Sequence, residues 1–165
     1  MKKLLLLSLI PLLFISCKKY EDGPYLSCRS AEKRLTGKWK VSELLYNQKD
    51  ITVAYYAPQL DLYPFNIYSD WSHSHFIAIT HADGSIIAKS PLVLNKKKTV
   101  MSFCLVPEDS KDTIVRNIFN LVPPLSAENN WTILRLKNDE FWMRTDYETN
   151  NFEIHFDLLT DFNDF

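Results

Sequence analysis

The end of the chain constrains the fold most, because its side chains alternate strictly between apolar and polar. From residue 152 to residue 158 every second side chain is apolar, and Glu153, His155 and Asp157 stand between them. Successive side chains of a β-strand point to opposite faces, so this pattern predicts a strand with one dry face. Such a strand needs neighbours of the same kind to cover its apolar side.

The preceding residues supply these neighbours. A strand is expected to begin at Lys38, with a bulge or bend near Glu43, and further apolar runs predict strands at 76–80, 85–94, 99–106, 131–137 and 140–147. The polar segments 81–84, 95–98, 138–139 and 149–151 have the composition of hairpin turns. Short helices are predicted at 30–35, with Ser30 as N-cap, and at 112–121 before two prolines. Hairpin-linked strands with few helices favour an all-β fold, an antiparallel up-and-down β-barrel with one or two short helices.

The first residues predict export. Two lysines follow Met1, the run 4–15 is apolar, and the small Ser16 precedes Cys17. This order is typical of a secretory signal peptide, and the run is shorter than the ~20 apolar residues that span a bilayer. We therefore expect a signal peptide at 1–16, a tether at 17–29 and one folded domain at 30–165.

Composition argues against several classes of function. The formal net charge is −1, and it becomes more negative when the two lysines of the signal peptide leave. Nucleic-acid binding would need a strongly basic surface, so no nucleic-acid partner is expected. The three glycines leave little room for phosphate-binding loops, and the sequence has no nucleophile-elbow or zinc-protease motif. We predict no enzymatic activity and no cofactor.

Three short motifs carry a family resemblance. Residues 14–17, Phe-Ile-Ser-Cys, look like a bacterial lipobox; Leu-Thr-Gly-Lys-Trp spans 35–39; and Glu-Ile-His-Phe spans 153–156. In these features the chain resembles the lipocalin-like lipoproteins of the Bacteroidetes type, which have a calycin-like β-barrel. Most such proteins are known as exported proteins without an assigned activity, so the resemblance concerns fold and location.

The resemblance implies roles for individual residues. Cys17 would carry the acyl chains, such as palmitate, that attach the protein to the lipid bilayer. Because Lys18 rather than Asp follows it, we expect the outer membrane of the cell envelope, on its periplasmic or surface side. Gly37 and Trp39 would form the motif whose indole plugs the closed end of the barrel. Lipocalins place an arginine over this tryptophan from their last strand, and here Arg135 or Arg144 would have to replace it.

An aromatic segment is the candidate binding surface. The side chains that we select as ligand-binding are Tyr55, Tyr56, Tyr63, Phe65, Tyr68 and Trp71. Aromatic residues on a long loop give a large contact area at the mouth of a barrel or at an interface. The alternative is that this loop folds over the open end and fills the barrel with side chains.

Histidines and cysteines allow further chemistry. His73 and His75 have the spacing of two ligands on one strand face, and only His81 or Asp70 could supply a third ligand nearby; a solvated polar strand face explains them better, so we predict no metal site. His155, between two acidic residues, is better explained as a polar residue of the outer face than as an acid–base catalyst. Cys28 and Cys104 either form one disulfide or stay unpaired, since export permits both.

Two functions remain after these exclusions. The first is a lipid-anchored, non-catalytic binding module for a small apolar ligand or a segment of a partner. The second is a structural or accessory envelope lipoprotein that acts through protein–protein contacts.

Overall fold

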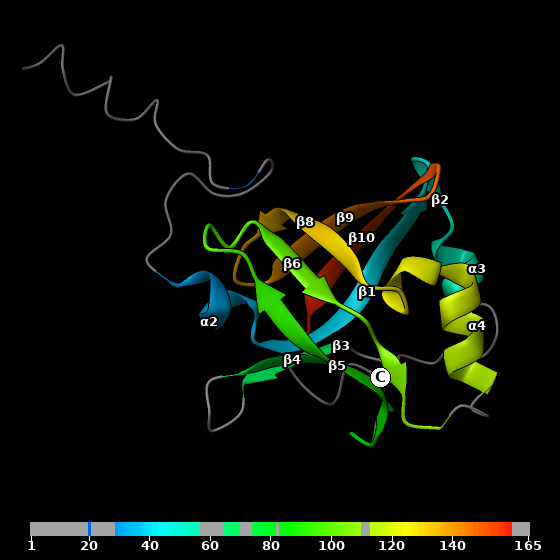
Figure 1. Cartoon of the computed structure of the whole chain (residues 1–165), viewed down its shortest axis with the longest axis horizontal. Helices are drawn as coiled ribbons and strands as arrows, with labels where there is room; N and C mark the ends of the chain where they lie inside the picture. The colour runs from blue at the N-terminus through cyan, green and yellow to red at the C-terminus, as the bar shows by residue number, and fades with distance from the viewer. Residues whose placement is uncertain are drawn as a thin grey trace, which may run out of the picture.

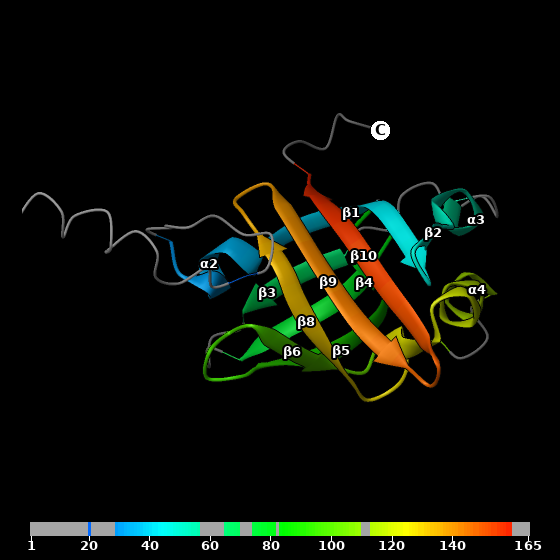
Figure 2. The ribbon, with the colours of Figure 1, turned by 90° about the horizontal axis from the view of Figure 1, so that it is seen from above.

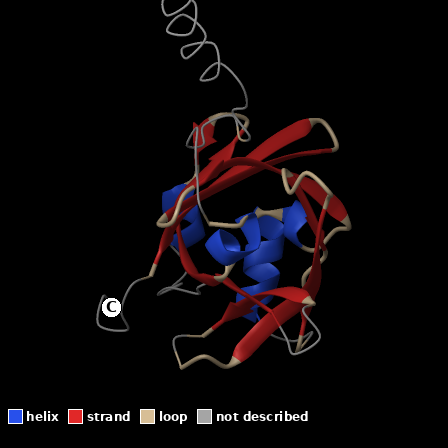
Figure 3. Cartoon of the chain, turned by 90° about the vertical axis from the view of Figure 1, so that its left-hand side faces the viewer, coloured by secondary structure: helices blue, strands red, loops and turns tan. Residues whose placement is uncertain are grey.

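The strands close into an antiparallel up-and-down barrel of eight strands, which confirms the expected fold class. The computed structural model describes residues 20, 29–56, 65–69, 74–81, 83–109 and 113–159. Figure 3 shows the ring of strands nearly end-on.

Each barrel strand pairs with the next one along the chain, and the last returns to the first. The eight strands are β1 (Gly37–Tyr46), β3 (Phe65–Ser69), β4 (His75–Thr80), β5 (Ile86–Leu94), β6 (Val100–Phe103), β8 (Asn129–Leu136), β9 (Glu140–Tyr147) and β10 (Asn150–Leu158). Pairing of β10 with β1, from Trp39↔Leu158 to Tyr46↔Phe152, closes the barrel. Two short strands lie beside this path: β2 (Lys49–Asp50) pairs antiparallel with the end of β1, and β7 (Val106–Pro107) pairs antiparallel with β5.

Local sequence explains the strand boundaries. The register of β1 against β10 shifts between Val41 and Glu43, at the place where the alternation of apolar residues predicts a bulge. The turn between β8 and β9 closes with the Lys137 amide donating to the Glu140 carbonyl at 2.8 Å. The turn between β9 and β10 lies at 148–149, slightly earlier than expected, with Tyr147 opposite Asn150.

The expected strand at 99–106 is interrupted. Between β6 and β7 the amide of Cys104 donates to the Ser90 side chain at 2.9 Å instead of to a backbone carbonyl. The next amide, that of Leu105, donates to the Leu125 carbonyl at 2.9 Å, and the Leu105 side chain is buried. The apolar run 99–106 is therefore split: residues 100–103 pair in β6, whereas Leu105 leaves the sheet and packs in the core.

Short helices cover both ends of the barrel (Figures 1 and 2). The predicted helix α2 (Ala31–Leu35) has Ser30 as its N-cap and lies where β1 begins. At the opposite end lie α3 (Thr52–Tyr56), α4 (Thr113–Leu121) and the 3₁₀ turn η2 (Pro123–Leu125). We call these the α2 end and the α4 end. Helices α3 and η2 exceed the one or two helices expected, and no helix among the described residues is long and apolar enough to cross a bilayer.

Side chains from all barrel strands fill the interior with one apolar cluster. Toward the α2 end four aromatic rings pack together, with edge contacts from Trp39 to Phe141 and from Phe65 to Phe156, and Phe141 stacked on Phe156. Toward the α4 end, Val115 and Ile118 of α4 are fully buried in the same cluster. The core therefore runs continuously from one end to the other.

Candidate functional site

The structure separates the predicted ligand-binding aromatics. Residues 65–69, expected within a long loop, form strand β3, because alternate side chains can enter the core there. Phe65 is 1% exposed and packs on Phe156 inside the barrel, so it is a core residue. Tyr55 and Tyr56 belong to α3, but their side chains, and all of Tyr63 and Trp71, lie outside the described residues. Their role in binding stays a prediction.

Tyr68 is the member of this set that lies on the outer wall. Its ring stacks on Phe76 with centroids 5.7 Å apart, and Phe76 lies opposite Pro91 on β5. Val93, two residues farther along β5, is 63% exposed. We call Tyr68, Phe76, Pro91 and Val93 the wall patch. An apolar row on a solvent-facing sheet departs from the usual polar outer face, and such patches often mark interaction sites.

A depression of about 400 Å³ adjoins this patch on the outer side of β1, β3 and β4. We call it the wall groove; its lining residues are Thr36, Gly37, Lys38, Asn66, Ile67, Tyr68, Ala78, Thr80, Gly84 and Ile86. Asn66 donates to the Thr80 hydroxyl at 2.7 Å, so these two polar groups are held in fixed positions. An apolar floor with a few oriented polar groups is typical of a binding site.

The histidines near this wall do not gather into a metal site. His75 makes a 2.8 Å hydrogen bond with Ser69 across β3 and β4, and His73 lies outside the described residues. Over the part of the chain that is described, no group of three histidine, cysteine, aspartate or glutamate residues is arranged to hold a metal ion.

His155 lies in a polar array on the opposite wall. Its Nδ1 is 2.6 Å from Glu43 and its Nε2 is 2.6 Å from Glu153, while its ring stacks on Trp142 with centroids 4.0 Å apart. The Arg135 guanidinium also lies over the Trp142 ring, with its central carbon 3.7 Å from the ring centroid. Sequence alternation placed His155 on the outer face but gave no sign of its burial, because Glu43 and Trp142 reach it from neighbouring strands.

This array is suited to holding strands together rather than to catalysis. Both imidazole nitrogens of His155 face carboxylate oxygens, so neither is open to a substrate, and the ring is only 8% exposed. Arg135 also pairs with Glu140 at 2.5 Å, and Lys137 pairs with the same carboxylate at 2.9 Å. The Glu140 carboxylate thus has two cationic partners, and each ring nitrogen of His155 lies within hydrogen-bond distance of a carboxylate.

The residues expected at the closed end are placed as follows. The Trp39 indole is fully buried and donates to the Leu35 carbonyl at 2.8 Å. A Cβ on Gly37 would lie 2.7 Å from the Leu158 side chain, which explains the absence of a side chain there. Arg135 lies over Trp142 and so does not replace the lipocalin arginine. The buried arginine of this end is instead Arg34 of α2, which donates to the Leu136 carbonyl.

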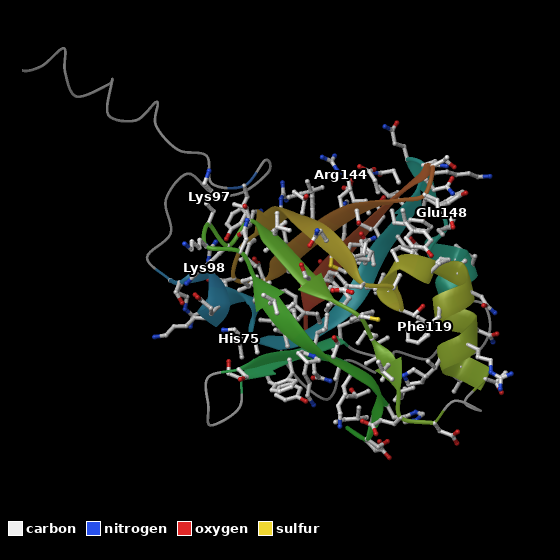
Figure 4. The ribbon with its side chains drawn as sticks, in the orientation of Figure 1. His75, Lys97, Lys98, Phe119, Arg144 and Glu148 are labelled. Atoms are coloured by element: carbon white, nitrogen blue, oxygen red, sulfur yellow. The ribbon has the colours of Figure 1, made fainter. Side chains whose placement is uncertain are left out.

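Arg144 does not fill that role either. It lies between the inward-facing Met143 and Thr145 in β9, so alternation directs it to the outer face, opposite Glu153. Figure 4 shows it pointing away from the barrel.

The cysteines give a mixed result. Cys104 forms no disulfide with any residue that the structure describes, and its Sγ lies 3.1 Å from the Ser126 carbonyl oxygen. Cys28 and Cys17 lie outside the described residues. A disulfide between Cys28 and Cys104, and acylation of Cys17, therefore stay predictions.

The comparisons with known proteins add no family. No protein-family model matches the sequence, and a search of curated proteins finds no significant match. The fold defines the class: a closed antiparallel eight-stranded β-barrel, compatible with a calycin or lipocalin-like fold. Function has to be inferred from the walls and ends of this barrel.

Proposed function

We propose that this chain is an exported, lipid-anchored β-barrel protein that acts as a non-catalytic binding module. The signal-like residues 1–16 and the lipobox-like Cys17 support the anchor, which we assign to the outer membrane. The wall groove carries the binding role, because it combines an apolar floor with fixed polar groups on an otherwise closed barrel.

The occupant that the geometry favours is an apolar segment of a partner protein. A site for a small apolar molecule usually encloses most of its ligand, whereas the wall groove lies open on the outer side of the sheet. It also adjoins the exposed wall patch, which lengthens the apolar surface beyond what a small molecule would cover. The interior itself is filled by the apolar cluster of the described residues.

Site-specific photocrosslinking in cells tests this proposal. A photoreactive residue at Val93, in the wall patch, is expected to capture one partner through a mainly apolar peptide. The same residue at Thr132, exposed on the outer face of β8, is the matched control and should capture none. Equal labelling from both positions would contradict the assignment of the binding site to this wall.

A second measurement separates the two kinds of occupant. Phe76→Lys, which puts a charge into the wall patch, should abolish the Val93 crosslink while leaving the barrel folded by circular dichroism. Native mass spectrometry of the purified protein should show no bound molecule. A small apolar molecule that is retained by the wild type and lost in Phe76→Lys would instead assign the groove to a small ligand.

A further inference from the structure

Residue 20 ties the beginning of the chain to one end of the barrel. The Tyr20 side chain is 3% exposed, belongs to the apolar core cluster and donates a hydrogen bond to the Lys98 carbonyl at 3.1 Å. The Arg34 guanidinium lies 5.5 Å from the centre of its ring. Lys98 lies in the turn between β5 and β6, and Arg34 lies in α2, so Tyr20 is fixed at the α2 end.

This attachment limits the distance between the barrel and the lipid anchor. Cys17 precedes Tyr20 by three positions in the sequence. An extended chain covers at most about 3.5 Å per residue, so the link from Tyr20 back to Cys17 can span no more than about 10 Å. Acyl chains on Cys17 would therefore hold the α2 end, and not the α4 end, against the bilayer.

The two ends differ in charge. Exposed cations at the α2 end are Arg29, Lys33, Lys96 and Lys97, against the exposed Asp139 of the β8–β9 turn, while Glu32 at this end is paired with Lys98. The α4 end is mainly acidic, with Asp50, Asp83, Glu108, Asp109, Glu128, Asp146 and Glu148 against Lys49, Lys89 and Arg116, of which Lys89 pairs with Glu108. Figure 4 shows Lys97 and Lys98 beside α2 and Glu148 at the far end.

We propose that the α2 end is a membrane-contact surface, in which Lys33, Lys96 and Lys97 bind the anionic headgroups of the bilayer that holds Cys17. This inference rests on the lipid anchor of the proposed function. Basic side chains near an anionic bilayer add to the attachment by an acyl chain and fix the orientation of the domain. The acidic α4 end is repelled by the same surface, so both ends favour one orientation. The wall groove, on the side of the barrel, would then not face the bilayer and would stay open to partners.

Lipid quenching of a fluorophore tests the orientation. The acylated full chain, with Cys28→Ser and Cys104→Ser, receives a dye either at Asn138→Cys in the β8–β9 turn or at Thr149→Cys in the β9–β10 turn; both native residues are exposed. In vesicles containing phosphatidylglycerol and nitroxide-labelled headgroups, the dye at position 138 should be quenched strongly. The dye at position 149 should not be quenched. The reverse pattern, or equal quenching, would overturn the proposal.

Charge variants test the cause of the orientation. Lys96→Gln/Lys97→Gln should lower quenching at position 138 and should weaken vesicle binding of a Cys17→Ser chain about tenfold. Lys49→Gln/Arg116→Gln removes the same number of charges at the α4 end and should change neither measurement. Equal effects of the two pairs would contradict a local headgroup contact.

A separate outcome tests the anchor itself. If the Cys17→Ser chain is exported and cleaved, and still floats with cell membranes as the wild type does in salt high enough to screen headgroup contacts, the lipid anchor of the proposed function is wrong. If flotation needs Cys17 but quenching does not distinguish the two dye positions, the anchor stands and the membrane-contact surface is wrong.

Discussion

The two walls of the barrel differ in how they are built. In the wall of β8, β9, β10 and β1, long strands pair over most of their length, as between Asn150↔Tyr147 and Asp157↔Glu140. In the wall of β3 to β6, strands are mostly shorter, and β5 meets β6 only at Val93 and Leu94. We call these the long wall and the short wall.

The outer faces of the two walls also differ, in the polarity of their side chains. The long wall carries Arg135, Trp142 and His155 as one stacked and ion-paired row. The short wall carries the apolar wall patch and the wall groove. Pairing and side-chain networks thus stabilise the long wall, whereas the short wall keeps apolar groups exposed, and it is this short wall that we propose as the binding surface.

The largest expected effect comes from the core behind the long wall. Phe141→Ala removes a ring that contacts both Trp39 and Phe156, and it should lower the free energy of unfolding by about 3–5 kcal/mol. Phe103→Ala, at the end of β6, should cost about 1 kcal/mol less, because the interrupted strand can relax into the space. Urea unfolding of both variants measures the difference. A larger loss for Phe103→Ala than for Phe141→Ala would contradict the view that the long wall contributes more to stability.

The polar array should give the next effect. His155→Ala leaves the Glu43 and Glu153 carboxylates without their shared partner and exposes one face of Trp142, so we expect a loss of about 1–3 kcal/mol. His155→Gln keeps an amide donor and should recover part of this loss. Thermal unfolding of the two variants provides the test, and unchanged stability in His155→Ala would show that the array does not support the long wall.

A smaller effect is expected from acid. A hydrogen bond from Lys137, and a second from Arg135, hold the pKa of Glu140 below its usual value. A carboxylate with a lowered pKa in the folded state stabilises the protein above its unfolded pKa, and this contribution is lost as the pH falls through the folded pKa. Because the pair is partly exposed, we expect at most about 1 kcal/mol.

The test compares the wild type with Glu140→Gln in urea at neutral pH and at about pH 3. The wild type should lose more stability on acidification than the variant does. An identical loss in both proteins would show that the Glu140 carboxylate does not stabilise the long wall.

The smallest stability effect is expected on the short wall. Val93→Thr changes an exposed side chain and should alter the free energy of unfolding by no more than about 0.5 kcal/mol. Crosslinking to the partner from a photoreactive residue at Pro91 should nevertheless fall. A variant that is clearly destabilised yet still binds would assign the wall patch to stability rather than to recognition.

The sequence predicts the long wall better than the short wall, for physical reasons. Residues 140–147 alternate cleanly and are bounded by tight turns, so the strand β9 was predicted with the bounds that the structure has. Strand β3 was missed because Pro64 precedes it and its aromatic residues suggested a loop. Alternation alone does not distinguish a short buried strand from an aromatic loop.

Contacts between distant strands were not predictable. The burial of His155 depends on Glu43, which meets it only because β10 returns to β1. The burial of Arg34 depends on the Leu136 carbonyl at the end of β8. The wall groove needs residues from β1, β3, β4 and the beginning of β5 to lie together, and no local pattern in the sequence records that arrangement.

Closure of β1 on β10 also determines when the barrel can finish folding. Strand β1 can pair with β3 early, but its pairing with β10 has to wait until the last strand has left the ribosome, so the unfinished sheet has two open edges throughout synthesis. Such long-range pairing slows folding and exposes those edges to other chains. A chaperone that shields the open edge of β1 until β10 is available would therefore raise the yield of folded protein.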